Sequence, residues 1–268
     1  MKVSVITINY NNAKGLKSTI ISVINQTYCD YEYIIIDGGS TDGSVDVIQN
    51  YADNINYWTS EKDRGIYHAM NKGVTRATGE YCLFLNSGDM FYNKYVLERL
   101  FKYSYTEEII VGEMYSSDDN NVIFPPPTRE LSMYHLYTAS ITHQSSFIRR
   151  NLLLKYPYDE KYRISSDWKF FLQSIILNDC SIKFVNEKVS IFDTNGVSSK
   201  NSDISWKERE SILKELLPRR ILLDYKWMKQ SECKTVCLTP RLRKHYTIDR
   251  IVYYLGNALL NFCEWIKI

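Results

Sequence analysis

Strand and helix patterns alternate from residue 3 to residue 113, and this alternation limits the possible folds more than any other feature of the chain. Apolar segments of strand length are separated by segments whose apolar residues recur at helical spacing. We expect strands at Val3–Asn9, Tyr31–Asp37, Tyr57–Ser60, Tyr81–Leu85 and Ile109–Glu113. We expect helices at Ala13–Gln26, from Ser40-Thr41-Asp42 onward, at Ile66–Ala77 and at about Lys94–Tyr103. Strands joined by such helices form right-handed βαβ units, so we predict an α/β fold with a mostly parallel, Rossmann-like sheet and helices on both faces.

The regular alternation ends near Gly112, and Pro125-Pro126-Pro127 then forces the chain to run extended. Further along, the patterns predict two strands, Thr142–Ile148 and Ser181–Val185, and a helix, Ser166–Leu177. Beyond about Gly196 the expected helices are Ile204–Leu217, Arg219–Lys229 and Thr247–Ile266. We therefore divide the chain into residues 1–112, residues 113–200 and a C-terminal helical extension of residues 201–268.

The composition is that of a globular protein with a sizeable core. Of the 268 residues, 44% are hydrophobic and 24% are charged, which suits one large domain or two small ones. A net charge of +2 gives no reason to expect a nucleic-acid partner. Met1-Lys2 runs straight into a strand pattern without a signal-peptide layout, and the six cysteines are scattered. These features favour a cytoplasmic protein with reduced cysteines.

Polar side chains directly follow the apolar strands. Tyr81–Leu85 leads into Asn86-Ser87-Gly88-Asp89, Asp37-Gly38-Gly39 ends the second strand, and Asp63 follows the third. Open α/β sheets bind ligands at the carboxyl edge of their strands, where these residues would meet. Carboxylate and amide oxygens are the ligands that Mg²⁺ and Mn²⁺ prefer. Taken alone, however, this stretch is better explained as a strand followed by a polar turn, with Asp89 capping the next helix.

Four blocks of the sequence, in this order, resemble one known family. They are Thr7–Asn11, Ile36–Ser44, Ser60–Tyr67 with Ala69–Gly73, and Phe84–Asp89. They look like family 2 glycosyltransferases of the GT-A fold, and most like the bacterial members that assemble O-antigen and capsular polysaccharide. The resemblance covers residues 1 to about 200. It implies an inverting, metal-dependent glycosyltransferase that moves a sugar from a nucleotide-diphosphate donor, a UDP-sugar, to a saccharide acceptor.

The resemblance also implies which residues bind the nucleotide-sugar donor. Thr7 and Tyr10 would lie along the nucleoside, and Asp37 would accept a hydrogen bond from the uracil ring. Asp63 and Arg64 would flank the nucleotide-sugar. One departure concerns Asp37, because it is followed by Gly38, where the family often has a second Asp.

The metal motif of the family corresponds to Asn86 and Asp89. The resemblance implies that these residues grip the donor diphosphate through Mn²⁺ or Mg²⁺, with Asp89 as the metal ligand and Asn86 on the donor. The motif keeps only one acid here, because Asn86 and Gly88 accompany Asp89.

The acceptor half contains the expected catalytic base. Ser166-Asp167-Trp168 resembles the family's Glu-Asp motif, in which the Asp takes the proton of the acceptor hydroxyl. From the residues alone, Asp167 is as well explained as a helix N-cap. His143 and Gln144 resemble a pair on the acceptor-facing strand, although a single His in an apolar strand is also typical of a hydrogen-bonded structural histidine.

The C-terminal segment combines positive charge with an amphipathic pattern. From Pro218 to Ile268 there are ten Lys/Arg and four Asp/Glu, a net charge of +6. Ile251–Ile266 has apolar residues at helical spacing but is too short and too polar to span a bilayer. The pattern is typical of an interfacial helix on anionic lipid at the inner face of the cell membrane, beside a lipid-linked acceptor. It equally fits a helix packed on its own catalytic domain or on a second subunit in a homodimer.

Three other functions compete with a glycosyltransferase. A sugar-nucleotide pyrophosphorylase has a similar fold, but this chain lacks a Gly-rich loop with Arg after the first strand. A non-catalytic nucleotide-sugar-binding protein would keep the donor residues without the base. A membrane-docking protein would not need the four polar motifs at the strand ends.

Overall fold

The computed structural model describes residues 2–118, 122–123, 131–194 and 202–229. The chain divides into two compact units, Met1–Leu216 and Leu217–Ile268. Within the second unit, residues 219–229 are helical, and the predicted helix Thr247–Ile266 lies outside the described residues. No described helix is both long enough and apolar enough to cross a membrane.

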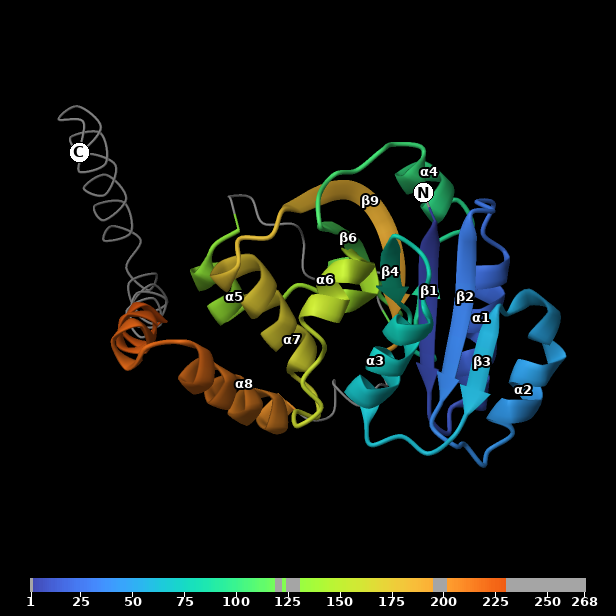
Figure 1. Cartoon of the computed structure of the whole chain (residues 1–268), viewed down its shortest axis with the longest axis horizontal. Coiled ribbons are helices and arrows are strands. Elements are labelled where there is room, and N and C mark those ends of the chain that lie inside the picture. The colour runs from blue at the N-terminus through green and yellow to red at the C-terminus, as the bar shows by residue number, and fades with distance from the viewer. Residues whose placement is uncertain (1, 119–121, 124–130, 195–201, 230–268) are drawn as a thin grey trace, which may run out of the picture. The chain divides into compact units, whose positions relative to one another are not determined.

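The first unit is built on one mixed sheet, in which the described residues contribute nine strands (Figure 1). The strands are β1 (Val3–Asn9), β2 (Tyr31–Asp37), β3 (Tyr57–Ser60), β4 (Tyr81–Phe84), β5 (Met90–Phe91), β6 (Ile109–Ser116), β7 (Val122–Ile123), β8 (Ser146–Arg149) and β9 (Ile182–Phe192). Their order is β3-β2-β1-β4-β8-β6-β9-β5, with β7 paired to β6. The four strands β3-β2-β1-β4 are parallel, as the alternation predicts. Beyond them, β8 is antiparallel to both β4 and β6, so the second half of the sheet is mixed.

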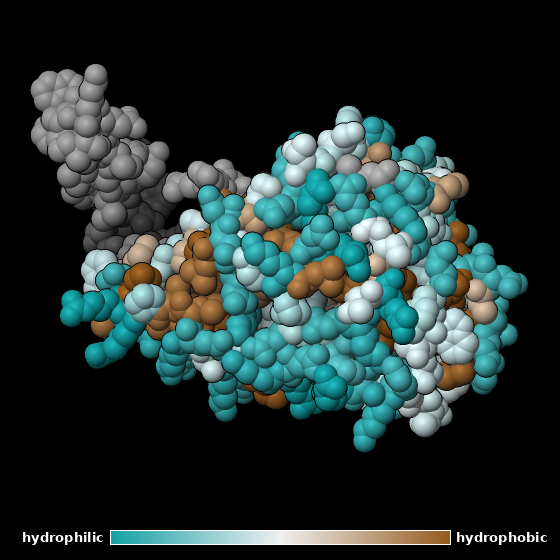
Figure 2. Space-filling model, viewed as in Figure 1, coloured by the Kyte–Doolittle hydropathy of each residue, from teal (hydrophilic) through white to brown (hydrophobic). Residues whose placement is uncertain are grey.

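Helices cover both faces of the parallel half of the sheet. The helices of the first unit are α1 (Ala13–Ile24), α2 (Ser44–Asn50), α3 (Ile66–Arg76), α4 (Val96–Phe101), α5 (Met133–Thr138), α6 (Arg150–Lys155), α7 (Ser166–Phe171) and α8 (Ser202–Leu216). Leu16 and Ile20 of α1 share a buried core with Val3 and Val5 of β1. On the opposite face α3 packs on β1, so closely that a Cβ atom at Gly73 would lie 2.5 Å from Cγ2 of Ile6. The surface in Figure 2 is largely hydrophilic, with apolar side chains in separate patches, because the apolar strand residues lie inside.

One predicted strand is wrong in its first half. Thr142–Ile148 is not a single strand, because residues His143–Ser145 form a 3₁₀ turn before β8 begins at Ser146. The hydroxyls of Thr142 and Ser145 lie 2.6 Å apart, and Ser146 Oγ donates to the carbonyl of Thr142 at 2.6 Å. Such local bonds from Ser and Thr side chains compete with strand pairing. His143 therefore lies in a turn, not in an apolar strand.

Other predicted boundaries shift for local reasons. The second helix begins at Ser44, and the Asp42 carboxylate accepts hydrogen bonds from the Ser44 amide and hydroxyl at 3.1 and 2.6 Å. The helix expected at Ser166–Leu177 changes after Phe171 into a π-helical segment, Leu172–Leu177. The strand expected at Ser181–Val185 continues as β9 to Phe192.

Helix α8 belongs to the first compact unit, although the sequence division places it in the C-terminal extension. The Glu208 carboxylate accepts hydrogen bonds from the backbone amides of Arg163, Ile164 and Ser165, at 2.7 to 2.9 Å. These three residues directly precede α7. Helix α8 therefore holds the start of α7, which carries Asp167.

Candidate active site

Asp37 joins the ends of three neighbouring strands. Its Oδ1 accepts hydrogen bonds from Asn9 Nδ2 at 2.7 Å and Ser40 Oγ at 2.6 Å. Its Oδ2 accepts from Ser60 Oγ at 2.6 Å and from the amides of Gly39 and Ser40 at 3.2 and 2.9 Å. Burial would raise the pKa of Asp37, but these bonds, with Ser40 and Ser60 foremost, hold it below its usual value. Because five donors use the lone pairs of this carboxylate, a nucleobase would have to displace one of them to reach it.

The two residues expected along the nucleoside differ in what they present. Thr7 is fully buried, and its hydroxyl lies 3.0 Å from that of Tyr33. Tyr10 is 69% exposed, and its ring lies against Gly38, with Cδ2 3.2 Å from the position of a Cβ atom there. Tyr10 therefore offers an aromatic face on which a base can stack, whereas the hydroxyl of Thr7 is buried.

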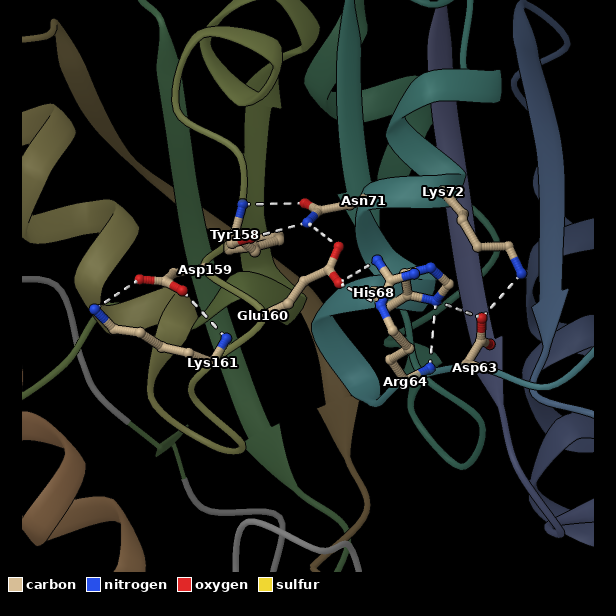
Figure 3. Close-up of polar contacts among 9 residues, drawn as sticks. All are labelled: Asp63, Arg64, His68, Asn71, Lys72, Tyr158, Asp159, Glu160 and Lys161. Carbon is tan, nitrogen blue, oxygen red and sulfur yellow. Dashed lines mark hydrogen bonds and ion pairs between the residues drawn. The ribbon is translucent and has the colours of Figure 1, made fainter.

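Arg64 connects the loop between β3 and α3 to the loop between α6 and α7. Its guanidinium binds the Glu160 carboxylate through Nη2 at 2.6 Å and Nε at 3.1 Å, as Figure 3 shows. Nearby, Asn71 Nδ2 donates to the carbonyl of Tyr158 at 2.8 Å. Glu160 and Tyr158 lie in the loop between α6 and α7, which the sequence does not connect to Arg64. Arg64 would have to leave Glu160, or share it, to bind a diphosphate.

Asp89 is a buried acid in the loop after β4, directly before β5. Its side chain is 3% exposed, and its Oδ1 accepts a hydrogen bond from the Asp193 amide at 3.0 Å. Burial raises the pKa of Asp89 to about 6, although the hydrogen bond from the Asp193 amide, the charge of His143 and a hydrogen bond with Gln144 each lower it. Gln144, predicted to face the acceptor, is thus in contact with Asp89.

Asp193 lies beside Gly88, at the position left open by the missing side chain. A Cβ atom at Gly88 would lie 2.5 Å from Oδ2 of Asp193. Gly88 also has a φ of 109°, a conformation that favours glycine. A carboxylate from the residue after β9 therefore lies beside the predicted metal motif, which has only one acid of its own. Asp193 was not among the predicted site residues, since only the pairing of β9 with β5 brings it here.

The oxygen atoms at this edge fit a hard divalent cation. Asp89 and Asp193 supply carboxylates, and Oδ1 of Asn86 is buried and accepts no hydrogen bond from a described residue. Carboxylate and amide oxygens are suitable ligands for Mg²⁺ or Mn²⁺. No group of three or more His, Cys, Asp and Glu side chains in the described residues could hold a metal by itself. An ion here would therefore need Asn86 and oxygens of a bound diphosphate.

Asp167 and His143 form a hydrogen-bonded pair. His143 Nδ1 lies 2.9 Å from Oδ2 of Asp167, and Tyr67 Oη donates to Oδ1 at 2.9 Å. Burial would raise the pKa of Asp167, but the hydrogen bond and charge of His143 and the Tyr67 hydroxyl hold it below its usual value. His143 Nε2 lies 3.3 Å from Nδ2 of Asn86. One imidazole thus connects the predicted base to the predicted metal motif.

The comparisons with known proteins decide the family. The model of the family described as Glycosyl transferase family 2 matches residues 4–171. The chain belongs to this family. An uncharacterised glycosyltransferase of Mycobacterium tuberculosis is 32% identical over 204 residues, 74% of this chain and 77% of the relative. A PGL/p-HBAD biosynthesis glycosyltransferase of Mycobacterium bovis is 31% identical over 181 residues, 62% of this chain and 67% of the relative.

Solved structures confirm the fold of this glycosyltransferase. Residues 1–349 of Staphylococcus aureus TarS, in complex with UDP-GlcNAc, align with a TM-score of 0.63 at 20% identity. The alignment covers 75% of this chain and 61% of that one. The mannosyltransferase PcManGT from Pyrobaculum calidifontis, in complex with GDP-Man and Mn²⁺, aligns with a TM-score of 0.54 at 16% identity. That alignment covers 71% of this chain and 56% of PcManGT, so this chain spans less than two thirds of either solved chain.

Proposed function

We propose that this family 2 glycosyltransferase transfers a sugar from a nucleoside-diphosphate sugar to a saccharide hydroxyl with inversion. The observation that carries the proposal is the connection of Asp167 through His143 to Asn86. This connection supports Asp167 as the proton acceptor, because it links the Asp167 carboxylate to the predicted metal motif in the loop after β4. A non-catalytic nucleotide-sugar-binding protein would not need this connection.

The diphosphate end of the donor would lie at Asn86, Asp89 and Asp193. These residues would hold Mn²⁺ or Mg²⁺, which offsets the negative charge that develops on the departing diphosphate. Asp89 and Asp193 bring two negative charges to this edge, so a cation also relieves their repulsion. Arg64, in the loop between β3 and α3, would also contact the donor.

Proton removal from the acceptor is assigned to Asp167, with His143 as its positioning partner. In a single displacement the acceptor oxygen attacks the anomeric carbon while its proton passes to the base. The bond between that carbon and the diphosphate oxygen breaks, and the nucleoside diphosphate leaves with the electron pair. Such a base contributes roughly 10²–10⁴-fold to the rate. Tyr67 and His143 hold the Asp167 carboxylate in place for this step.

The donor we propose is a UDP-sugar. TarS is solved with UDP-GlcNAc and PcManGT with GDP-Man and Mn²⁺, which supports nucleoside-diphosphate sugars as the class. Thermal unfolding of the full chain with UDP-, GDP- and other sugar nucleotides, with and without Mn²⁺, tests this choice. A metal-dependent rise in the midpoint is expected for the true donor. NMR of the product must then show the inverted anomeric configuration, and binding without turnover would favour the non-catalytic alternative.

The acceptor we propose is a lipid-linked saccharide in the synthesis of a cell-surface polysaccharide of the O-antigen or capsule type. The name of the Mycobacterium bovis relative assigns it to PGL/p-HBAD biosynthesis, so related enzymes also serve other glycans. Support for a membrane location comes from the +6 charge of residues 218–268, most of which lie outside the described residues. Each basic residue near an anionic surface contributes roughly 1 kcal/mol. The full chain should therefore sediment with anionic liposomes at low salt and be released at high salt, and a chain that ignores liposomes would contradict this location.

A further inference from the structure

Asp63 is a buried carboxylate of which only one oxygen is bound. Its side chain is 8% exposed, and Oδ1 lies 2.9 Å from both Lys72 Nζ and His68 Nδ1 (Figure 3). Because a carboxylate only accepts, both neighbours donate to Oδ1. Oδ2 is buried and accepts no hydrogen bond from any described residue. A buried oxygen without a donor is costly, so a donor from a ligand is expected at this atom.

The unbound oxygen faces the space that Gly38 leaves open. A Cβ atom at Gly38 would lie 3.5 Å from Oδ2 of Asp63 and 3.2 Å from Cδ2 of Tyr10. Glycine at this position therefore keeps a side chain from filling the region between the Tyr10 ring and Asp63. The neighbouring acid Asp37 cannot serve the same purpose without losing one of its five donors.

We infer that Oδ2 of Asp63 accepts a hydrogen bond from the ring N–H of the donor's nucleobase, and so selects the base. This inference rests on the proposed function. The base enters beside Tyr10, a residue that is 69% exposed; its ring moves to give access to Oδ2 and then stacks on the base. Uracil and guanine have a ring N–H on their base-pairing edge, whereas the corresponding ring nitrogens of cytosine and adenine only accept hydrogen bonds. Asp63 therefore favours uracil and guanine nucleotides over cytosine and adenine nucleotides.

The variant Asp63→Asn tests the inference by reversing the polarity of one atom. Lys72 and His68 both donate, so they retain the amide oxygen of the new side chain and turn its NH₂ group toward Gly38. Calorimetric titration of the full chain with UDP and CDP in Mg²⁺ measures the effect. The wild type should bind UDP at least about 10-fold more tightly than CDP, since an unmatched buried polar group costs that much or more. In Asp63→Asn this ratio should fall to one or invert, and GDP and ADP should follow the same trend.

The control is Glu61→Gln, which removes the other carboxylate that pairs with Lys72, at 2.7 Å, without changing Asp63. It should keep the UDP/CDP ratio of the wild type. If Asp63→Asn does not fold, UDP methylated at N3 tests the wild type directly and should bind at least about 10-fold more weakly than UDP. An unchanged UDP/CDP ratio in Asp63→Asn, equal binding of the methylated nucleotide, or a wild type that prefers CDP or ADP overturns the inference. A wild type that binds no nucleoside diphosphate at all instead overturns the proposed function, and the inference with it.

Discussion

Nδ1 of His143 lies 2.9 Å from Oδ2 of Asp167, although 24 residues separate them in the chain. Because the carboxylate can only accept, Nδ1 carries the proton in this contact. Nε2 lies 3.3 Å from Nδ2 of Asn86 and accepts a hydrogen bond from this amide when the imidazole is neutral. The His143 ring therefore connects the predicted base, Asp167, to Asn86 in the loop after β4. Each of these residues can be tested by substitution.

The first prediction concerns Asp167 as the base. Asp167→Asn keeps the shape of the side chain and an acceptor for Tyr67, so the fold and donor affinity should survive. Turnover should fall by roughly 10²–10⁴-fold, the usual loss of a general base. Steady-state kinetics and UDP titration measure the two quantities separately. Asp179→Asn is the matched control, because Asp179 is exposed and its φ of 49° suits Asn. Near-normal turnover of Asp167→Asn would show that another residue is the base, and His143 would be the next candidate.

The second prediction concerns the effect of His143 on Asp167. Burial raises the pKa of Asp167, and His143 is the foremost group that lowers it. In His143→Ala the pKa of Asp167 should rise, so the acidic limb of the kcat/KM profile should move to higher pH. A purely structural histidine would lower activity equally at all pH values. A pH–rate profile of the variant distinguishes these results.

The third prediction concerns the stability cost of burying Asp89. Its pKa is raised from 3.8 to about 6, so the folded state resists ionisation and loses stability as the pH rises between those values. A shift of this size corresponds to about 3 kcal/mol at neutral pH. Asp89→Asn should therefore unfold at higher urea in EDTA at pH 7.5, should show no such gain at pH 3.5, and should lose Mn²⁺-dependent stabilisation.

A control of opposite sign is available for the third prediction. Partial desolvation would raise the pKa of Asp42, which is exposed, but hydrogen bonds from Ser44 and the Ala13 amide outweigh this effect and lower the pKa. Asp42→Asn should therefore destabilise the protein at pH 7.5 and have less effect at low pH. Equal pH dependence of the two variants would contradict the environment described for Asp89.

The fourth prediction concerns the space that Gly88 leaves for Asp193. Gly88→Ala combines a positive φ with a Cβ atom 2.5 Å from the Asp193 carboxylate, so it should cost roughly 1–3 kcal/mol and displace that carboxylate. Gly43→Ala is the matched control, with a φ of 91° and nothing within 4 Å of its Cβ position. Urea unfolding and Mn²⁺ titration of both variants separate backbone strain from displacement. Equal loss of Mn²⁺ affinity in the two variants would argue against a role for Asp193.

Several features of the site were predictable from local sequence. The strands β1 to β4 and the helices between them follow from apolar spacing, which acts within a few residues. The same spacing places Asp37 at the end of β2 and Asp63 and Asp89 in the loops that follow β3 and β4, at the carboxyl edge of parallel strands. The four motifs also predicted family 2, which the family model confirms.

The partners of those residues depended on tertiary structure. Arg64 and Glu160 are 96 residues apart, and Asp89 and Asp193 are 104 residues apart. These contacts depend on the order of β8, β6 and β9 in the mixed half of the sheet, where no local pattern specifies the neighbour. The turn at His143 was also missed, because short hydroxyl side chains there bind the backbone more favourably than the sheet does. The sequence by itself thus determined which polar groups reach the sheet edge, since the strand period and the glycines act locally. The packing of distant segments decided how many hydrogen bonds each group accepts within the protein: both oxygens of Asp37 accept them, whereas Oδ2 of Asp63 accepts none from a described residue.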